Sequence, residues 1–267
     1  MKPGTLILII VFLIMVLIFC LRSCEEEDYF EDTKIENSTD TIVETIPEFP
    51  YGKPIRDYEV PEKEIPVKEI VSEWPDSIYK SVEGYPFLND IQKKVIIEVN
   101  KCRTNPSRYA DEVIVPFLHS IRSDNIYVDK NGLNIKMHEG KTAVEEAISA
   151  LRNLQPVGIL KPKEYLCKAA LDHCKDLGPK GYAGHGGSDD SDPMTRVKRY
   201  NSKSGGIGEN IDYGSNTAEE IVRNLIVDDG VNPRGHRENL YYNYKYIGVG
   251  FGKHSTMRYM CVMDFEM

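Results

Sequence analysis

The sequence predicts an α+β domain over residues 81–267 of the 267-residue chain. Apolar residues recur at helical spacing in several segments between residues 89 and 200. Two β-rich runs close the chain, and one helical segment lies between a strand-like segment and these runs. A sheet with helices on both faces is the simplest arrangement that buries so many half-apolar elements.

The first predicted helix spans about residues 89–103 and ends before Asn105 and Pro106. Pro106 can open a second helix, because its fixed φ suits a first turn. Residues 119–140 contain two short β-prone runs around a Lys-Asn-Gly turn, and they form either a small hairpin or an irregular excursion.

Two further helices are predicted in the middle of the domain. Thr142 and Glu145 are spaced as a capping box, which opens a helix that ends by Pro156. The next helix spans about residues 163–177 and is followed by a Gly-Pro pair, a common stop signal.

The last third of the domain alternates between the two element types. Asp192 and Thr217 are placed as helix N-caps, and Glu220 completes a second capping box. The elements predicted here are helices at residues 192–200 and 217–228, a strand at 208–213, and an antiparallel hairpin of 246–251 with 259–265 that has a long turn.

The N-terminal segment, residues 1–24, is interpreted as a transmembrane anchor or a signal segment. Residues 3–21 are uncharged and almost wholly apolar, which meets the minimum length for spanning a bilayer. A cleaved signal peptide and a lipid anchor at Cys24 are the two alternatives. All three readings place the rest of the chain outside the cytoplasm, either tethered to the membrane or secreted.

Residues 25–80 are predicted to form an acidic, Pro-containing and mostly disordered stalk. We expect Trp74 and Tyr79 to dock onto the domain as its leading edge. Residues 25–76 carry 17 acidic and 5 basic side chains, a net charge of −12 within a total of −9, so the rest carries about +3. No basic stripe with interleaved aromatic residues occurs, so a nucleic-acid partner is not expected.

Four polar side chains lie in Gly-flanked turns between residues 184 and 239, and we expect them to converge on one polar site. They are His185, Glu209, Asp228 and His236. Glycine tolerates positive φ and permits close approach, which suits turns of this kind.

Five motifs in order resemble the CAP superfamily, which comprises cysteine-rich secretory proteins, antigen 5 and pathogenesis-related proteins. They are N-K-C-R-T-N-P at 100–106, H-G-G at 185–187, G-E-N-I at 208–211, G-H-R-E-N-L at 235–240 and I-G-V-G at 247–250. The resemblance covers about residues 85–267 and is closest to short, disulfide-poor microbial members. It implies a three-layer α-β-α sandwich with a central antiparallel sheet.

The resemblance also implies a cleft lined by His185, Glu209, Asp228 and His236, with a divalent metal at the two histidines. Two imidazoles suit Zn²⁺, and carboxylates can complete or orient them. The position of Asp228 is open to the neighbouring Asp229. The alternative without a metal is that the histidines hydrogen-bond the two carboxylates and tie loops together.

The predicted function is an extracytoplasmic binding module rather than an enzyme. Lipids including sterols, or extracellular proteins, are further ligands that the resemblance implies. The alternative is a metal-dependent, peptidase-like hydrolase with Glu209 as the general base.

The remaining histidines and cysteines are expected to play no part in the cleft. We interpret His173 as packed on its helix and His254 as solvated in the hairpin turn. Four cysteines fall in the domain, an even number that is compatible with two disulfides or with free buried thiols.

Overall fold

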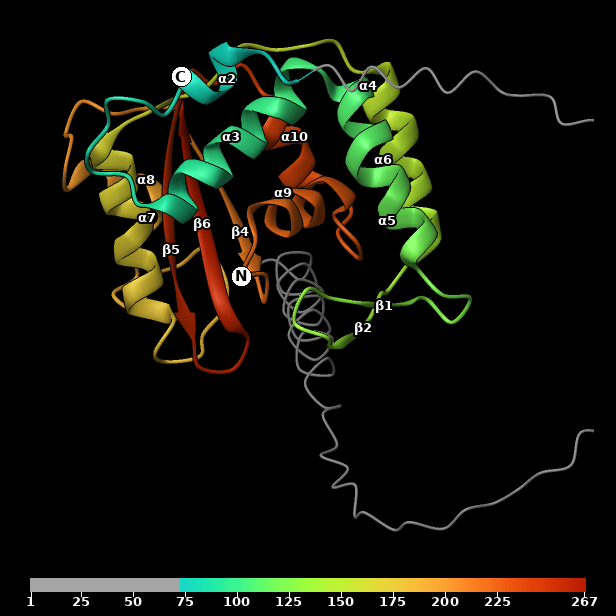
Figure 1. Cartoon of the computed structure of the whole chain (residues 1–267). Coiled ribbons are helices and arrows are strands. Elements are labelled where there is room, and N and C mark those ends of the chain that lie inside the picture. Colours follow the sequence, from blue (N-terminus) through green and yellow to red (C-terminus); the bar gives the residue numbers. More distant parts are fainter. Residues whose placement is uncertain (1–72) are drawn as a thin grey trace, which may run out of the picture. The chain divides into compact units, whose positions relative to one another are not determined.

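The computed structural model describes residues 73–267 (Figure 1). The apolar segment at residues 1–24 and the predicted stalk up to residue 72 lie outside the described residues. Within residues 73–267, no helix is long and apolar enough to cross a membrane.

The domain is built on a four-stranded sheet in the order β3-β5-β6-β4. Strands β5 (Tyr246–His254), β6 (Arg258–Glu266) and β4 (Ile207–Tyr213) pair antiparallel, as the predicted hairpin and strand require. Strand β3 (Lys161–Pro162) adds a short parallel pairing to β5. The fold is therefore α+β with a predominantly antiparallel sheet.

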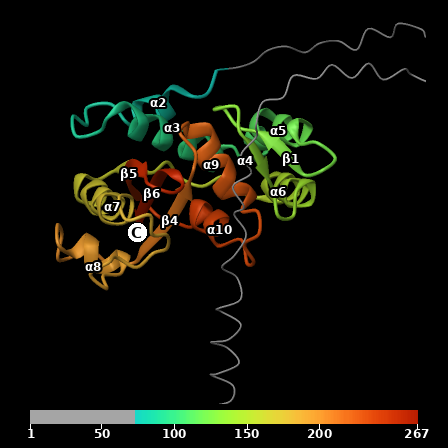
Figure 2. The ribbon, with the colours of Figure 1, turned by 90° about the horizontal axis from the view of Figure 1, so that it is seen from below.

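Helices cover both faces of this sheet, which confirms the predicted sandwich (Figure 2). Helices α7 (Glu164–Leu177) and α8 (Pro193–Lys198) lie on one face. Helices α3 (Asp90–Thr104), α9 (Ala218–Val227) and α10 (Gly235–Tyr241) lie on the other. Alternate strand side chains serve the two faces: Val249 packs in the core on the α3 side, whereas Val262 packs in the core on the α7 side.

Gly248 and Gly250 of the I-G-V-G motif explain how closely α7 lies on β5. A Cβ atom at Gly248 would stand 2.1 Å from the Leu166 carbonyl carbon, and one at Gly250 would stand 2.4 Å from that of Ala170. Both contacts are with helix backbone, which cannot move aside cheaply. Glycine at these positions therefore permits the approach of helix to sheet.

The second predicted helix is divided into α4 (Pro106–Tyr109), the π-helical turn η1 (Ala110–Ile114) and α5 (Val115–Ser120). Pro116 has no N–H to donate in the first turn of α5, and π-helical turns accommodate such defects. Residues 119–140 form the hairpin of the two options, with β1 (Ile126–Val128) antiparallel to β2 (Asn134–Lys136).

Helix α6 (Lys141–Asn153) begins without the predicted capping box. Its N-cap is Gly140, at φ 67°, and Thr142 lies inside the first turn. Thr217, by contrast, caps α9 as predicted, because its Oγ1 accepts the Glu220 N–H at 3.3 Å. The difference arises because the chain enters α6 through a left-handed glycine whose amide donates to Asp229.

The folded part includes the last residues of the predicted stalk. Trp74 is buried beside the short helix α2 (Asp76–Lys80). Its Nε1 donates to Glu112 at 3.0 Å, and the Arg108 guanidinium lies 4.1 Å from its ring centroid. Trp74 thus docks as expected, whereas Tyr79 is exposed.

The four cysteines of the domain are free and buried. Burial raises the pKa of the Cys102 thiol to about 12 and that of Cys167 to about 11. Among the described residues, the free-thiol alternative is therefore the one that the structure shows.

The turn of the C-terminal hairpin is shorter than predicted, and His254 is the reason. The His254 side chain is buried, so the prediction that it is exposed to solvent was wrong. Its Nδ1 accepts the Met257 N–H at 3.1 Å, and its Nε2 contacts the Tyr182 carbonyl at 2.9 Å. The bond from Met257 closes the turn, and the contact with Tyr182 ties the turn to the loop that follows α7.

Candidate functional site

Strand β4 sends neighbouring polar side chains to opposite faces of the sheet. It is an edge strand, so loops on both faces can reach it. Glu209 points to the α7 side, as does Ile211, which packs there. Asn210 points to the α10 side, where its Nδ2 donates to the His236 carbonyl at 2.8 Å. The G-E-N motif therefore serves both halves of the site.

His185 reaches Glu209 from the loop that follows α7. Its Nδ1 lies 2.8 Å from the Glu209 Oε1. The imidazole is 53% exposed and the Glu209 side chain only 2%. A buried carboxylate thus holds a histidine whose ring faces solvent.

Arg196 of α8 connects the loop that carries His185 to strand β4 through hydrogen bonds. Its buried guanidinium donates to the carbonyls of His185 and Ser191, each at 2.9 Å, and to the Glu209 Oε2 at 2.6 Å. Both Glu209 oxygens are therefore engaged, one by His185 and one by Arg196. Nothing in the local sequence pattern singles out Arg196, because its partners lie 5 to 13 residues away on other elements.

His236 is held by Asp228 in a matching way. The Asp228 Oδ1 lies 2.6 Å from the His236 Nδ1, and its Oδ2 accepts the His236 backbone N–H at 3.0 Å. Asp228 caps α9 in the left-handed region, which aspartate tolerates better than most residues. Its neighbour Asp229 instead accepts backbone N–H groups of residues 138–140, so Asp228 and not Asp229 is the partner of His236.

The two imidazoles face each other across the edge of the sheet. Their ring centroids are 6.5 Å apart and their planes are inclined by 34°. Each ring uses Nδ1 for its carboxylate, so Nε2 is the atom that is left for a ligand. The structure thus brings together the four side chains that the sequence singled out, as two His–carboxylate pairs.

Burial and neighbouring charges shift the pKa values of Glu209 and Asp264, the two carboxyl groups next to the His185 loop. Burial alone would raise the pKa of Glu209, but the hydrogen bond from His185 and the charge of Arg196 lower it. Burial and the Glu209 carboxylate raise the pKa of the neighbouring Asp264 well above its usual value. The pKa values of the two neighbouring carboxyl groups are thus shifted in opposite directions, that of Glu209 downward and that of Asp264 upward.

His173 lies behind the same loop and is buried, as predicted. Its Nε2 contacts the Gly184 carbonyl at 2.9 Å. Burial and the nearby Arg196 lower its pKa, so this imidazole is neutral. It supports the loop and does not reach the cleft.

The side chains available as metal ligands determine how a metal could be held between the two histidines. Among residues 73–267, no group of three or more His, Cys, Asp or Glu side chains is arranged around one metal position. The two imidazoles fit a metal through Nε2, and the carboxylates fit the role of orienting groups that hydrogen-bond Nδ1. A metal here would take its remaining ligands from water or from a bound molecule.

The chain was compared with protein families and with curated proteins, and both comparisons found a match. Residues 145–265 match the family CAP, described as the Cysteine-rich secretory protein family. The chain is 32% identical over 109 residues to the "Uncharacterized protein YkwD" of Bacillus subtilis strain 168. This match covers 40% of the chain and 40% of the length of YkwD.

Among the solved structures that are similar to part of the chain are two bacterial proteins. An outer surface protein from Borrelia burgdorferi has a TM-score of 0.36 and 21% identity, over 41% of this chain and 78% of that one. An extracellular protein containing a SCP domain from Bacillus anthracis strain Ames has a TM-score of 0.35 and 19% identity, over 47% of this chain and 37% of that one.

Proposed function

The chain carries a domain of the CAP superfamily, of the microbial type, and we propose that this domain is an extracytoplasmic binding module whose cleft holds a divalent metal. The ligands of the metal are the Nε2 atoms of His185 and His236. Zn²⁺ suits such imidazole donors.

The observation that supports this proposal is the pairing of each imidazole with a buried carboxylate. Glu209 and Asp228 are each 2% exposed and bond Nδ1 at 2.8 and 2.6 Å. A carboxylate on Nδ1 fixes the tautomer and makes Nε2 a better metal donor. When bound, the metal supplies a Lewis-acid centre for an oxygen or nitrogen donor of a ligand.

The same geometry favours binding over hydrolysis. A general base must reach a water or substrate proton, but both Glu209 oxygens are engaged and the side chain is almost fully buried. Asp228 is likewise bonded through both oxygens to His236. This geometry supports a role for the two carboxylates in holding the histidines rather than in taking a proton.

Calorimetric titration of Zn²⁺ into the full chain tests the proposal. We expect one binding event, which is lost in the His185→Ala/His236→Ala double variant. Two protein ligands are fewer than the three or four of typical zinc sites, so we expect weaker binding than at a structural zinc.

The matched control is His119→Ala, which removes an exposed histidine from α5. It should leave the heats unchanged. Equal heats from the native chain and the double variant would contradict the metal proposal, as would an equal loss in the His119 variant.

The extracytoplasmic location has its own test. In intact cells that express the chain, protease added outside should remove the domain, provided that residues 1–24 act as an anchor or export signal. A domain that is degraded only after lysis would contradict this part of the proposal.

A further inference from the structure

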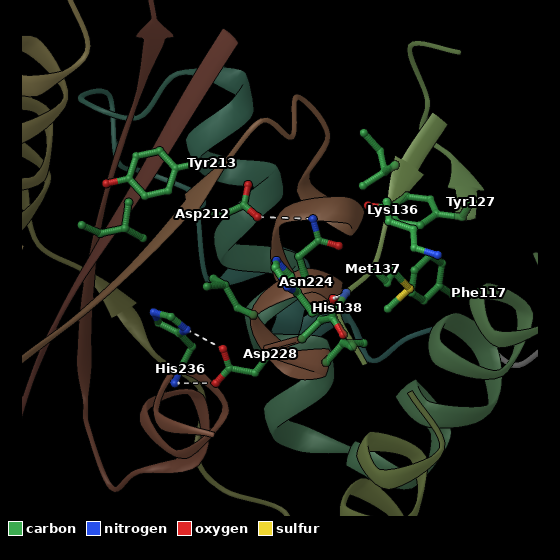
Figure 3. A pocket seen from close by; sticks show the side chains of 15 residues that line it. Phe117, Tyr127, Lys136, Met137, His138, Asp212, Tyr213, Asn224, Asp228 and His236 are labelled. Atoms are coloured by element: carbon green, nitrogen blue, oxygen red, sulfur yellow. Dashed lines mark hydrogen bonds and ion pairs between the residues drawn. The ribbon is translucent and has the colours of Figure 1, made fainter. Parts of the chain in front are cut away.

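The turn between α9 and α10 carries Asp228 and His236, which form one of the two His–carboxylate pairs (Figure 3). The pair lies at one end of a pocket of about 470 Å³, and Tyr127 and Met137 line the other end. Asp228 has φ 55°, in the left-handed region, and its carbonyl accepts the Val231 N–H at 3.1 Å. The direction in which the Asp228 side chain points therefore depends on how this turn is held.

Arg234, the N-cap residue of α10, bonds the turn through its side chain. Its Nη1 donates to the Asp228 carbonyl at 2.7 Å and to the Val231 carbonyl at 3.0 Å. The side chain is only 18% exposed, so water competes little for these bonds. Two bonds from one rigid guanidinium fix the backbone from which Asp228 reaches His236.

Two glutamates hold the Arg234 guanidinium in this position. Glu139 pairs with it through both oxygens, at 2.6 Å to Nη1 and 2.8 Å to Nη2. Glu146 of α6 accepts from its Nε at 2.8 Å. Hydrogen bonds from Arg234 and from the Gly230 N–H lower the pKa of Glu139 to about 2, so its bonds to Arg234 are charge-assisted. Pairing through two parallel bonds fixes the plane of the guanidinium as well as its place.

Glu139 belongs to a segment that is bonded to the α9–α10 turn by its main chain as well. Asp229 accepts the N–H groups of His138 and Glu139 at 2.7 and 2.8 Å. In the other direction, the Glu139 carboxylate accepts the Gly230 N–H at 2.7 Å. The family match begins at residue 145, so Glu139 lies in a part of the chain that this match does not include.

We propose that Arg234, oriented by Glu139, is a positioning residue for His236. The guanidinium holds the turn, and the turn directs the Asp228 carboxylate to Nδ1 of His236. The carboxylate keeps the ring proton on Nδ1 and leaves the lone pair of Nε2 free. This inference rests on the proposed function for the use of Nε2, but it predicts the state of the ring in the metal-free chain.

The position of the ring proton is the readout, because the stability of the fold does not set it. Without a carboxylate on Nδ1, nothing selects this tautomer and the proton is shared with Nε2. NMR of the full chain with isotope-labelled imidazole nitrogens measures the tautomer, without metal and at about pH 8, where histidines of ordinary pKa are neutral. We expect the Nδ1–H tautomer at both His185 and His236 in the native chain.

Arg234→Gln should shift His236 toward the Nε2–H tautomer, because the turn loses both bonds to its carbonyls. His185 is the internal reference in the same sample. Its ring is held by a different carboxylate, Glu209 at 2.8 Å, so it should keep the Nδ1–H tautomer.

Glu139→Gln is a second variant, which keeps Arg234 and removes its charge-assisted pair. The Glu139 side chain is 38% exposed, so we expect this variant to fold. It should shift His236 in the same direction by a smaller amount, since Glu146 still bonds Arg234. Combined with Arg234→Gln, it should shift the tautomer no further than Arg234→Gln alone, because both changes act along the same contacts.

The matched control is Arg152→Gln. It removes an arginine–carboxylate pair of α6, with Asp111 at 2.6 Å. Both histidine rings should keep their native tautomers in this variant.

A folded Arg234→Gln variant that keeps the native tautomer at His236 would overturn the proposal, as would an equal shift in the Arg152→Gln chain. The Nε2–H tautomer at His236 of the native chain would overturn it too. Where Arg234→Gln does not fold, a native tautomer in the Glu139→Gln variant has the same consequence.

Calorimetry with Zn²⁺ separates this inference from the proposed function. Arg234→Gln should bind Zn²⁺ about tenfold more weakly than the native chain does. Lack of Zn²⁺ binding by the native chain would contradict the metal site, while the tautomer comparison would still decide the role of Arg234.

Discussion

His185 and His236 are held by the same two kinds of bond, although they approach opposite faces of β4. Each ring bonds a buried carboxylate through Nδ1. Each backbone carbonyl accepts from another polar side chain, Arg196 at 2.9 Å for His185 and Asn210 at 2.8 Å for His236. Main chain and ring are thus both fixed, which preorganises the two Nε2 atoms.

Glu209→Gln should weaken Zn²⁺ binding by about 10- to 100-fold. The amide cannot act as the ionised acceptor that keeps the proton on Nδ1 of His185, so Nε2 becomes a poorer donor. Calorimetry with Zn²⁺ measures the change.

The control for this variant is Glu238→Gln, an exposed position in α10 near His236. It should leave Zn²⁺ affinity as it is. Native affinity in Glu209→Gln would show that the carboxylate does not orient a metal ligand.

Asp212 should make the stability of the domain depend on pH. Its folded pKa is about 7 and its ordinary value is 3.8, so its contribution to stability is full below about pH 3.8 and is lost as the pH rises toward 7. Asp212→Asn removes this loss. Relative to the native chain, the variant should gain about 2–3 kcal/mol of unfolding free energy between about pH 5 and pH 8.

Urea unfolding of both chains across this pH range measures the effect. The comparison cancels the other titrating groups, which the two chains share. A difference that stays constant with pH would mean that Asp212 is ionised normally in the folded state.

Glycines recur in the core strand β5 because helix α7 packs closely against this strand. Gly250→Ala would place a Cβ atom 2.4 Å from the Ala170 carbonyl carbon of α7. We expect a loss of about 1–3 kcal/mol or more, because the helix must move off the sheet. Chemical denaturation measures the loss.

Gly158→Ala is the matched control, since a Cβ atom there would meet nothing within 4 Å. Its effect should stay within about 1 kcal/mol and can be stabilising. Equal losses in the two variants would refute the close approach of α7 to β5.

The whole domain is expected to be stable without disulfides. Its four cysteines are buried and free, and burial raises the pKa of Cys174 to about 12. Native protein should resist iodoacetamide at these four positions, because the reaction needs an exposed thiolate.

Peptide mass spectrometry tests this in two steps. In urea without reductant, all four cysteines should become alkylated. A requirement for reductant would reveal a disulfide among them and contradict the free-thiol structure.

Most elements of the fold, and the four side chains that form the two His–carboxylate pairs, could be predicted from the sequence. Amphipathic periods marked the helices, and the order of five short motifs pointed to His185, Glu209, Asp228 and His236. The capping box at Thr142 and the solvated His254 were wrong, since tertiary contacts at Gly140 and Tyr182 outweigh the local pattern.

What the sequence determined by itself is local: helical and strand periods, most stops, and the candidate His and acidic residues. Only the tertiary structure decided which of Asp228 and Asp229 holds His236, that Arg196 stands behind Glu209, and that the β1–β2 hairpin walls a pocket over α9. The reason is physical. Periodicity reports which face of an element is buried, whereas these contacts depend on which elements meet, and the hairpin and α9 are joined across about 90 residues of chain.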